Sequence, residues 1–96
     1  EVKKTTLPYL GMDYLRVKKY QVAAALFDKT KMEYPEYAGG YYATAVLSKR
    51  TGELNKAIQY YKKVVELDDE NEPDLTERAK EQLELLLADK SSSKNN

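Results

Sequence analysis

The feature that most constrains this chain is an internal repeat with a period of 34 residues. Shifting the 96-residue sequence by 34 positions aligns two consecutive segments. The aligned pairs are Leu7 with Tyr41, Gly11 with Ala45, Tyr20 with Leu54, Ala23 with Ala57, and Phe27 with Tyr61. Repeats of this length are supersecondary units that bury their apolar faces by stacking on their neighbours. The period therefore predicts a stack of similar units.

Within each unit the apolar residues recur at the spacing of an amphipathic helix. Glycine at position 11 lets a second helix approach closely and seat Ala23 and Phe27 against the first. Gly52 can adopt the left-handed backbone that commonly ends a helix. The patterns, with Pro35 and Pro73 as boundaries, predict helices over 6–18, 21–34, 38–51, 53–67 and 73–89.

The residues that mark the two units follow an ordered motif. In the first unit they are Leu7, Leu10, Gly11, Tyr14, Ala23, Phe27 and Pro35. In the second unit they are Tyr41, Thr44, Ala45, Ser48, Ala57, Tyr61 and Asp69. The first set resembles the pattern of the tetratricopeptide repeat (TPR) family in all but the opening aromatic residue. The second set regains that aromatic residue but departs from the pattern at Thr44, Ser48 and Asp69, where the family has leucine, tyrosine and proline.

This resemblance implies an all-α fold, a right-handed α-solenoid of antiparallel helix pairs with about five helices. It divides a single domain at residues 1–90 into one repeat at 4–37, a second at 38–71 and a capping helix at 73–89. Such a half repeat covers the apolar face of the last full repeat and shows water a polar face. Residues 91–96 are polar, and we expect them to form a flexible tail.

The composition argues against an enzyme or a cofactor-binding protein. The chain has no histidine and no cysteine, which removes the commonest general base and the commonest metal ligands. It has no glycine-rich phosphate loop, and the acids near Asp68 and Asp69 lack the spacing of a calcium loop. We therefore expect no catalytic residues, no metal and no cofactor.

The TPR resemblance implies instead that the first helix of each repeat lines a concave face on which a protein or peptide binds. The positions that would face this partner are Met12, Leu15 and Arg16 in the first repeat and Tyr42, Val46, Lys49 and Arg50 in the second, with Pro8 and Lys80 beside them. An apolar surface with cations at its rim suits a partner with hydrophobic anchors and some acidic groups. Some TPR co-chaperones grip a chaperone's C-terminal carboxylate with lysine and asparagine, but Pro8, Met12 and Val46 occupy those positions here, so that role is not implied.

Charge leaves a second function open. The net charge is zero, which argues against a nucleic-acid partner. Residues 1–65, however, carry 12 basic and 6 acidic side chains, and residues 66–96 carry 4 basic and 10 acidic ones. The alternatives to a peptide-binding scaffold are a self-associating assembly domain that stacks through oppositely charged ends, and an accessory domain of a larger protein. We expect no membrane span, and a homo-oligomer stays open.

Two further points are open at this stage. The glycines at positions 39 and 40 either ease the chain out of the turn after Pro35 or give a partner close access to the backbone. The sequence predicts a soluble protein but not its compartment, because a chain without cysteine fits the bacterial cytoplasm as well as the periplasm or cell envelope.

Overall fold

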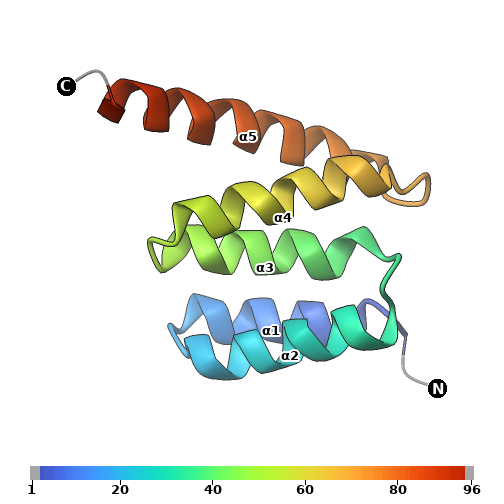
Figure 1. Ribbon diagram of the computed structural model, residues 1–96. Coiled ribbons are helices and arrows are strands. Elements are labelled where there is room, and N and C mark those ends of the chain that lie inside the picture. Colours follow the sequence, from blue (N-terminus) through green and yellow to red (C-terminus); the bar gives the residue numbers. More distant parts are fainter. Residues whose placement is uncertain (1–2, 95–96) are drawn as a thin grey trace.

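All regular secondary structure in the described part of the protein is α-helix, and short turns connect the helices (Figure 1). The computed structural model describes the backbone of residues 3–94 and the side chains of residues 3–90, and this range contains no strand. The helices are α1 (Thr6–Arg16), α2 (Tyr20–Glu33), α3 (Ala38–Arg50), α4 (Leu54–Leu67) and α5 (Pro73–Lys94). The all-α prediction is confirmed, and the helix bounds differ from the predicted ones by at most two residues except at the end of α5.

α5 continues to Lys94, beyond the predicted end at residue 89. No glycine or proline follows Pro73, and extending a formed helix by one residue is much easier than starting one. The backbone of residues 91–94, which we expected in a flexible tail, is therefore helical. The last two residues of that expected tail lie outside the described residues.

Consecutive helices run in opposite directions, and α3 is the central element (Figure 1). α3 packs on each of the other four helices, whereas α2 and α4 do not pack on each other within the described range. The shortest dimension of the molecule is 18 Å, which is close to two helix diameters of about 10 Å. The helices therefore form two layers, in which α3 lies beside α1 and α5 while α2 and α4 lie across from it.

Two apolar clusters share this central helix. One lies between α1, α2 and α3 and consists of Leu15, Ala23, Phe27, Ala43 and Leu47. The other lies between α3, α4 and α5 and consists of Ala38, Ala45, Ala57, Ile58, Tyr61, Val64, Ala79 and Leu86. The partly buried side chain of Val46 packs against both clusters, so the two halves of the core are continuous.

Glycine allows close packing inside both halves of the molecule. A Cβ atom at Gly11 would overlap the ring of Phe27, as the sequence analysis predicted. A Cβ atom at Gly39 would overlap the ring of Tyr37, and one at Gly40 would lie 3.2 Å from a methyl group of Thr30. These two glycines therefore make room for side chains of their own chain.

The 34-residue register persists in the backbone. The amide of Lys19 donates to the carbonyl of Tyr14 at 2.9 Å, and 34 positions later the amide of Glu53 donates to the carbonyl of Ser48 at 2.8 Å. Lys18 and Gly52, which are also 34 positions apart, both have left-handed backbones with φ of 64° and 83°. The prediction for Gly52 is confirmed, and the two interhelical turns have the same hydrogen-bond pattern.

Candidate functional site

The residues predicted to contact a partner lie on α1 and α3, which pack side by side. Met12, Tyr42 and Val46 are half-buried, and Arg16, Lys49 and Arg50 are exposed. Leu15 is only 1% exposed and belongs to the core between α1, α2 and α3. It is therefore not accessible to a partner, because its side of α1 points into the contact with α3. Pro8, which we expected beside this surface, is buried as well.

The apolar part of this surface is fixed by the core beneath it. Met12 and Val46 pack against the cluster that contains Phe27. The ring of Tyr42 meets the buried ring of Tyr61 edge to face, with 5.6 Å between centroids. Burial raises the pKa of Tyr61 well above its ordinary value, and the neighbouring Tyr42 adds to this shift. The half-buried side chains of this surface are therefore held in place from below.

The cations around this apolar area differ in how they are held. Arg16 forms an ion pair with Asp13 on the same helix at 2.5 Å. Lys49 donates a hydrogen bond of 2.7 Å to the side chain of Gln82 on α5. Arg50 makes no ion pair and no side-chain hydrogen bond with any described residue, so it is free to meet an acidic group. Lys80, the other predicted neighbour, pairs with Glu77 at 3.5 Å on α5.

Charge in the folded molecule separates by edge, and this differs from the separation by ends that we expected. The α1–α2 and α3–α4 turns lie at one edge, and the α2–α3 and α4–α5 turns lie at the opposite edge (Figure 1). The basic residues Arg16, Lys18, Lys19, Lys49 and Arg50 lie at the first edge, beside the acid Glu53, and the acidic residues Glu36, Asp68, Asp69, Glu70 and Glu72 lie at the second, beside Lys4. A simple division of the sequence does not describe this distribution, because antiparallel helices return the chain to the same edge every second turn.

The outer side of α1 is an apolar surface whose residues the sequence analysis did not name. Tyr9 is 70% exposed and Leu10 is 43% exposed. The residues 34 positions later, Ala43 and Thr44, are only 4% and 6% exposed, because they pack against the first helix pair. The repeat register was the signal that could have identified this surface, because positions 9 and 10 correspond to positions 43 and 44, which the first helix pair covers.

Two kinds of feature are absent from the described residues. No group of three or more histidine, cysteine, aspartate or glutamate side chains among them is arranged to hold a metal ion. None of the helices in this part of the chain combines the length and the apolar character needed to cross a membrane.

Neither the family models, nor the curated proteins, nor the solved structures contain a match to this chain.

Proposed function

We propose that this chain is a protein-interaction scaffold of the TPR type, a right-handed α-solenoid of two helix pairs capped by α5. The proposed partner binds on the face that α1 and α3 share. The 34-residue motif supports this reading, together with the equivalent backbone hydrogen bonds of Lys19 and Glu53. The departures of Thr44, Ser48 and Asp69 from the TPR pattern are part of the same proposal and mark the second pair as a divergent copy.

The observation that carries the proposed function is the composition of this face. Met12, Tyr42 and Val46 form a half-buried apolar strip, and Arg16, Lys49 and Arg50 lie exposed around it. Interfaces commonly combine a few large apolar or aromatic anchors with arginine at a polar rim. The partner that fits is a peptide segment with one or two apolar anchors and carboxylates beside them.

A binding assay with acidic peptides tests this proposal. Fluorescence anisotropy would measure binding of labelled peptides that combine aspartate or glutamate with leucine, phenylalanine or tyrosine. Arg16→Glu with Arg50→Glu should weaken the best binder at least about tenfold, since a tenfold change corresponds to about 1.4 kcal/mol. The matched control is Lys29→Glu with Lys62→Glu, which reverses two exposed cations on α2 and α4. Equal losses in both double variants would show that binding is not localised on this face.

Self-association is a second candidate function, and one observation favours it. The exposed outer side of α1, with Tyr9 and Leu10, is equivalent to a surface that is buried in the second helix pair. A second copy of the chain could cover this apolar side of α1, and such a dimer would not depend on attraction between oppositely charged ends. Sedimentation equilibrium of the protein and of Leu10→Asp tests this, because a dimer built on α1 should become monomeric in the variant. A monomer at high protein concentration would exclude it.

A further inference from the structure

A hollow of about 780 Å³ lies at the edge where the α2–α3 and α4–α5 turns meet. Pro35, Leu67 and the rings of Tyr34 and Tyr37 supply its apolar lining. Its acidic lining residues are Glu36, Asp68, Asp69 and Glu70, and its basic lining residue is Lys4. Positions 36 and 70 are 34 residues apart, so equivalent turns of the two units build this hollow together.

Three of the carboxylates in this hollow are unpaired. Glu36, Asp68 and Glu70 are exposed and form neither an ion pair nor a side-chain hydrogen bond with any described residue. The nitrogen of Lys4 lies 5.1 Å from the centre of the Tyr37 ring and forms no ion pair with a described acid. The hollow therefore has an excess of negative charge that the described part of the fold does not neutralise.

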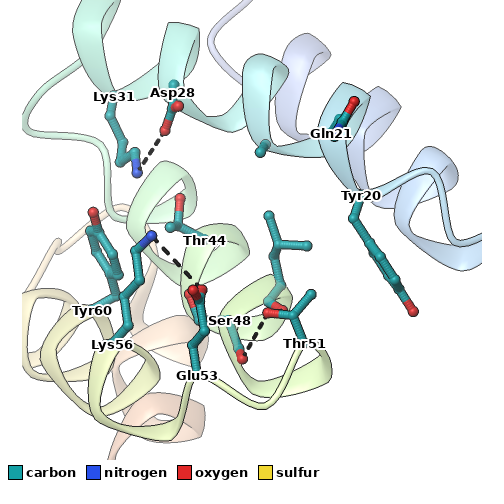
Figure 2. Close-up of a pocket in the computed structure, with 12 residues that line it drawn as sticks. Tyr20, Gln21, Asp28, Lys31, Thr44, Ser48, Thr51, Glu53, Lys56 and Tyr60 are labelled. Atoms are coloured by element: carbon teal, nitrogen blue, oxygen red, sulfur yellow. Dashed lines mark hydrogen bonds and ion pairs between the residues drawn. The ribbon is translucent and has the colours of Figure 1, made fainter.

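The cleft between α2 and α4 differs from this hollow because its charges are matched. It measures about 310 Å³, and its base consists of buried side chains of α3 (Figure 2). Lys31 pairs with Asp28 at 3.2 Å, and Lys56 pairs with Glu53 at 3.8 Å. The unmatched charge lies at the edge of the molecule instead.

The acids at this edge are not arranged around a single point. No group of three or more of them among the described residues is placed to hold a metal ion. A guest that neutralises them must therefore present several separate cations. Lysine side chains suit this hollow, because their apolar stems can lie along Pro35 and Leu67 while their ammonium groups meet the carboxylates.

The turn between α1 and α2 presents such side chains at the opposite edge. Val17 is 64% exposed, and Lys18 and Lys19 are exposed as well. Neither lysine forms an ion pair or a side-chain hydrogen bond with any described residue. This basic tip, residues 17–19, therefore combines one apolar side chain with two unpaired cations, and it complements the hollow in both respects.

The backbone of the basic tip carries strain that its counterpart avoids. Lys18 has φ of 64°, and the equivalent residue of the second unit is Gly52, with φ of 83°. A residue with a Cβ atom is strained in this region, and such residues cluster at functional sites. The second turn has glycine and then Glu53, so the turn itself does not require lysine. The first turn thus keeps a cation at its tip against the preference of its backbone.

The basic tip and the hollow lie at opposite edges of one molecule (Figure 1). One copy of the chain therefore cannot bring them together, but two copies can. Because the hollow lacks cations and the tip lacks acids, each supplies the charge that the other needs. This complementarity selects a second copy of the chain as the occupant.

We propose that the hollow binds the basic tip of a second copy of this chain. Lys18 and Lys19 of the second copy meet the three unpaired carboxylates, and Val17 lies against Pro35 and Leu67. The contact is heterologous, since each copy uses its tip towards one neighbour and its hollow towards the other, so it leads to a row or a closed ring of copies. It uses neither the α1–α3 face nor the outer side of α1, and it is independent of the functions proposed for them.

Sedimentation velocity at two salt concentrations provides the first test. At about 10 mM salt the protein should associate with a Kd of about 0.1–1 mM. At about 1 M salt the association should weaken at least about tenfold, because the Debye length falls from about 30 Å to about 3 Å. A monomer at about 1 mM protein in low salt, or an association that salt does not change, would overturn the proposal.

An exchange of charges localises the contact. Lys18→Glu with Lys19→Glu reverses the tip, and Glu36→Lys with Glu70→Lys reverses the hollow, so each double variant alone should be monomeric. A mixture of the two should associate again, because each reversed tip meets a reversed hollow. Circular dichroism of each variant checks its fold. A mixture of folded variants that stays monomeric would show that these surfaces do not meet.

The matched control is Lys29→Glu with Lys62→Glu, which changes the net charge by the same amount as reversal of the tip does. It should associate as the parent protein does. If it becomes monomeric too, the loss reflects net charge and not the tip, and the proposal is wrong.

Two single variants separate this contact from fold stability and from a dimer through α1. Lys18→Gly relaxes the backbone of the tip, so it should leave the melting temperature unchanged or raise it while weakening association about threefold to tenfold. Unchanged association would contradict the role of Lys18. Leu10→Asp alters the outer side of α1 and should leave the salt-sensitive association intact. If it instead abolishes association, the copies meet through α1 and the proposal is overturned.

Discussion

The two helix pairs share one backbone plan but fill it with different side chains. In the first pair the ring of Phe27 packs over Gly11, where even one added carbon would overlap it. In the second pair Tyr61 and Ala45 occupy the same positions in the repeat and are 1% and 0% exposed. Both positions carry the larger residue in the second pair, and both are buried there. The same backbone plan therefore holds more side-chain volume at these two positions in the second pair than in the first.

The same comparison shows that burial depends on the neighbouring unit. Tyr9 and Leu10 are exposed, and their equivalents Ala43 and Thr44 are packed against α2 and α1. Large side chains at positions 43 and 44 would push the first helix pair away. Position within the repeat sets which way a side chain points, and the adjacent helices set what size it can have.

Truncating the central ring of each pair should have the largest effect on stability. Phe27→Ala and Tyr61→Ala should each lower the free energy of unfolding by about 3–5 kcal/mol, because both rings are fully buried. Urea denaturation followed by circular dichroism at the helical band measures this. Since Val46 joins the two clusters, we expect one cooperative transition in each variant. Two separate transitions, one unchanged from the parent protein, would show that the pairs unfold independently.

The contact between Gly11 and Phe27 should give the next largest effect. Gly11→Ala should destabilise the protein by about 1–3 kcal/mol through overpacking, although alanine is the better helix former by about 1 kcal/mol. The reverse exchange in the second pair, Ala45→Gly, should cost about 1 kcal/mol from helix propensity alone. Thermal or urea melts of both variants compare the two sites. A Gly11→Ala variant more stable than the parent would contradict the close approach.

The turns that close the two pairs should differ in their response to alkaline pH. Tyr37 follows the first pair, and burial, followed by the carboxylate of Glu72, raises its pKa to about 12. The neutral phenol is favoured in the folded state, so its stabilisation is complete below about pH 10 and is lost as the pH rises towards 12. The equivalent residue after the second pair is Asn71, which does not titrate.

The variant Tyr37→Phe isolates this contribution. It should retain up to about 2 kcal/mol more of its neutral-pH stability than the parent protein does between pH 10 and 12. Unfolding by urea at several pH values, with tyrosinate absorbance recorded in parallel, provides the measurement. Parallel loss of stability in both proteins would assign the alkaline sensitivity to other groups, of which the buried Tyr61 is one.

The smallest effect concerns the two left-handed turn residues. Lys18 has φ of 64° and Gly52 has φ of 83°, and a residue with a Cβ atom is strained in this region. Lys18→Gly should therefore stabilise the protein by about 1 kcal/mol, and Gly52→Lys should destabilise it by a similar amount. Melting temperatures of the two variants, each compared with the parent, give opposite signs if the turns are equivalent. Shifts of the same sign would show that they are not.

Much of the fold could be predicted from the sequence because the repeat pattern reports local geometry. Helix periodicity placed all five helices, and Gly11 and Gly52 marked a close contact and a left-handed turn. Lys18 gave no such signal, since nothing in its side chain indicates a left-handed backbone. Its turn became apparent only through the hydrogen bonds that it shares with the second pair.

The candidate surfaces were harder to predict because they depend on contacts between helices. The TPR resemblance placed Leu15 on the partner-facing surface, but its side chain lies in the core between α1, α2 and α3, so the family position alone did not decide its exposure. The hollow beside Glu36 and Asp68 depends on two turns that are far apart in the sequence meeting at one edge, which no local pattern encodes. The edge charges depend on the direction of successive helices. In each case the missing information was the arrangement of neighbours in space.

The uncovered side of α1 also bears on how such a chain could grow. Both terminal helices expose apolar side chains: α1 shows Tyr9 and Leu10, and α5 shows Leu85 and Leu87 among charged residues such as Glu77 and Glu81. An additional unit duplicated from residues 38–71 would therefore meet apolar surface at either end of the stack. The architecture is open to lengthening by gene duplication on both of its sides.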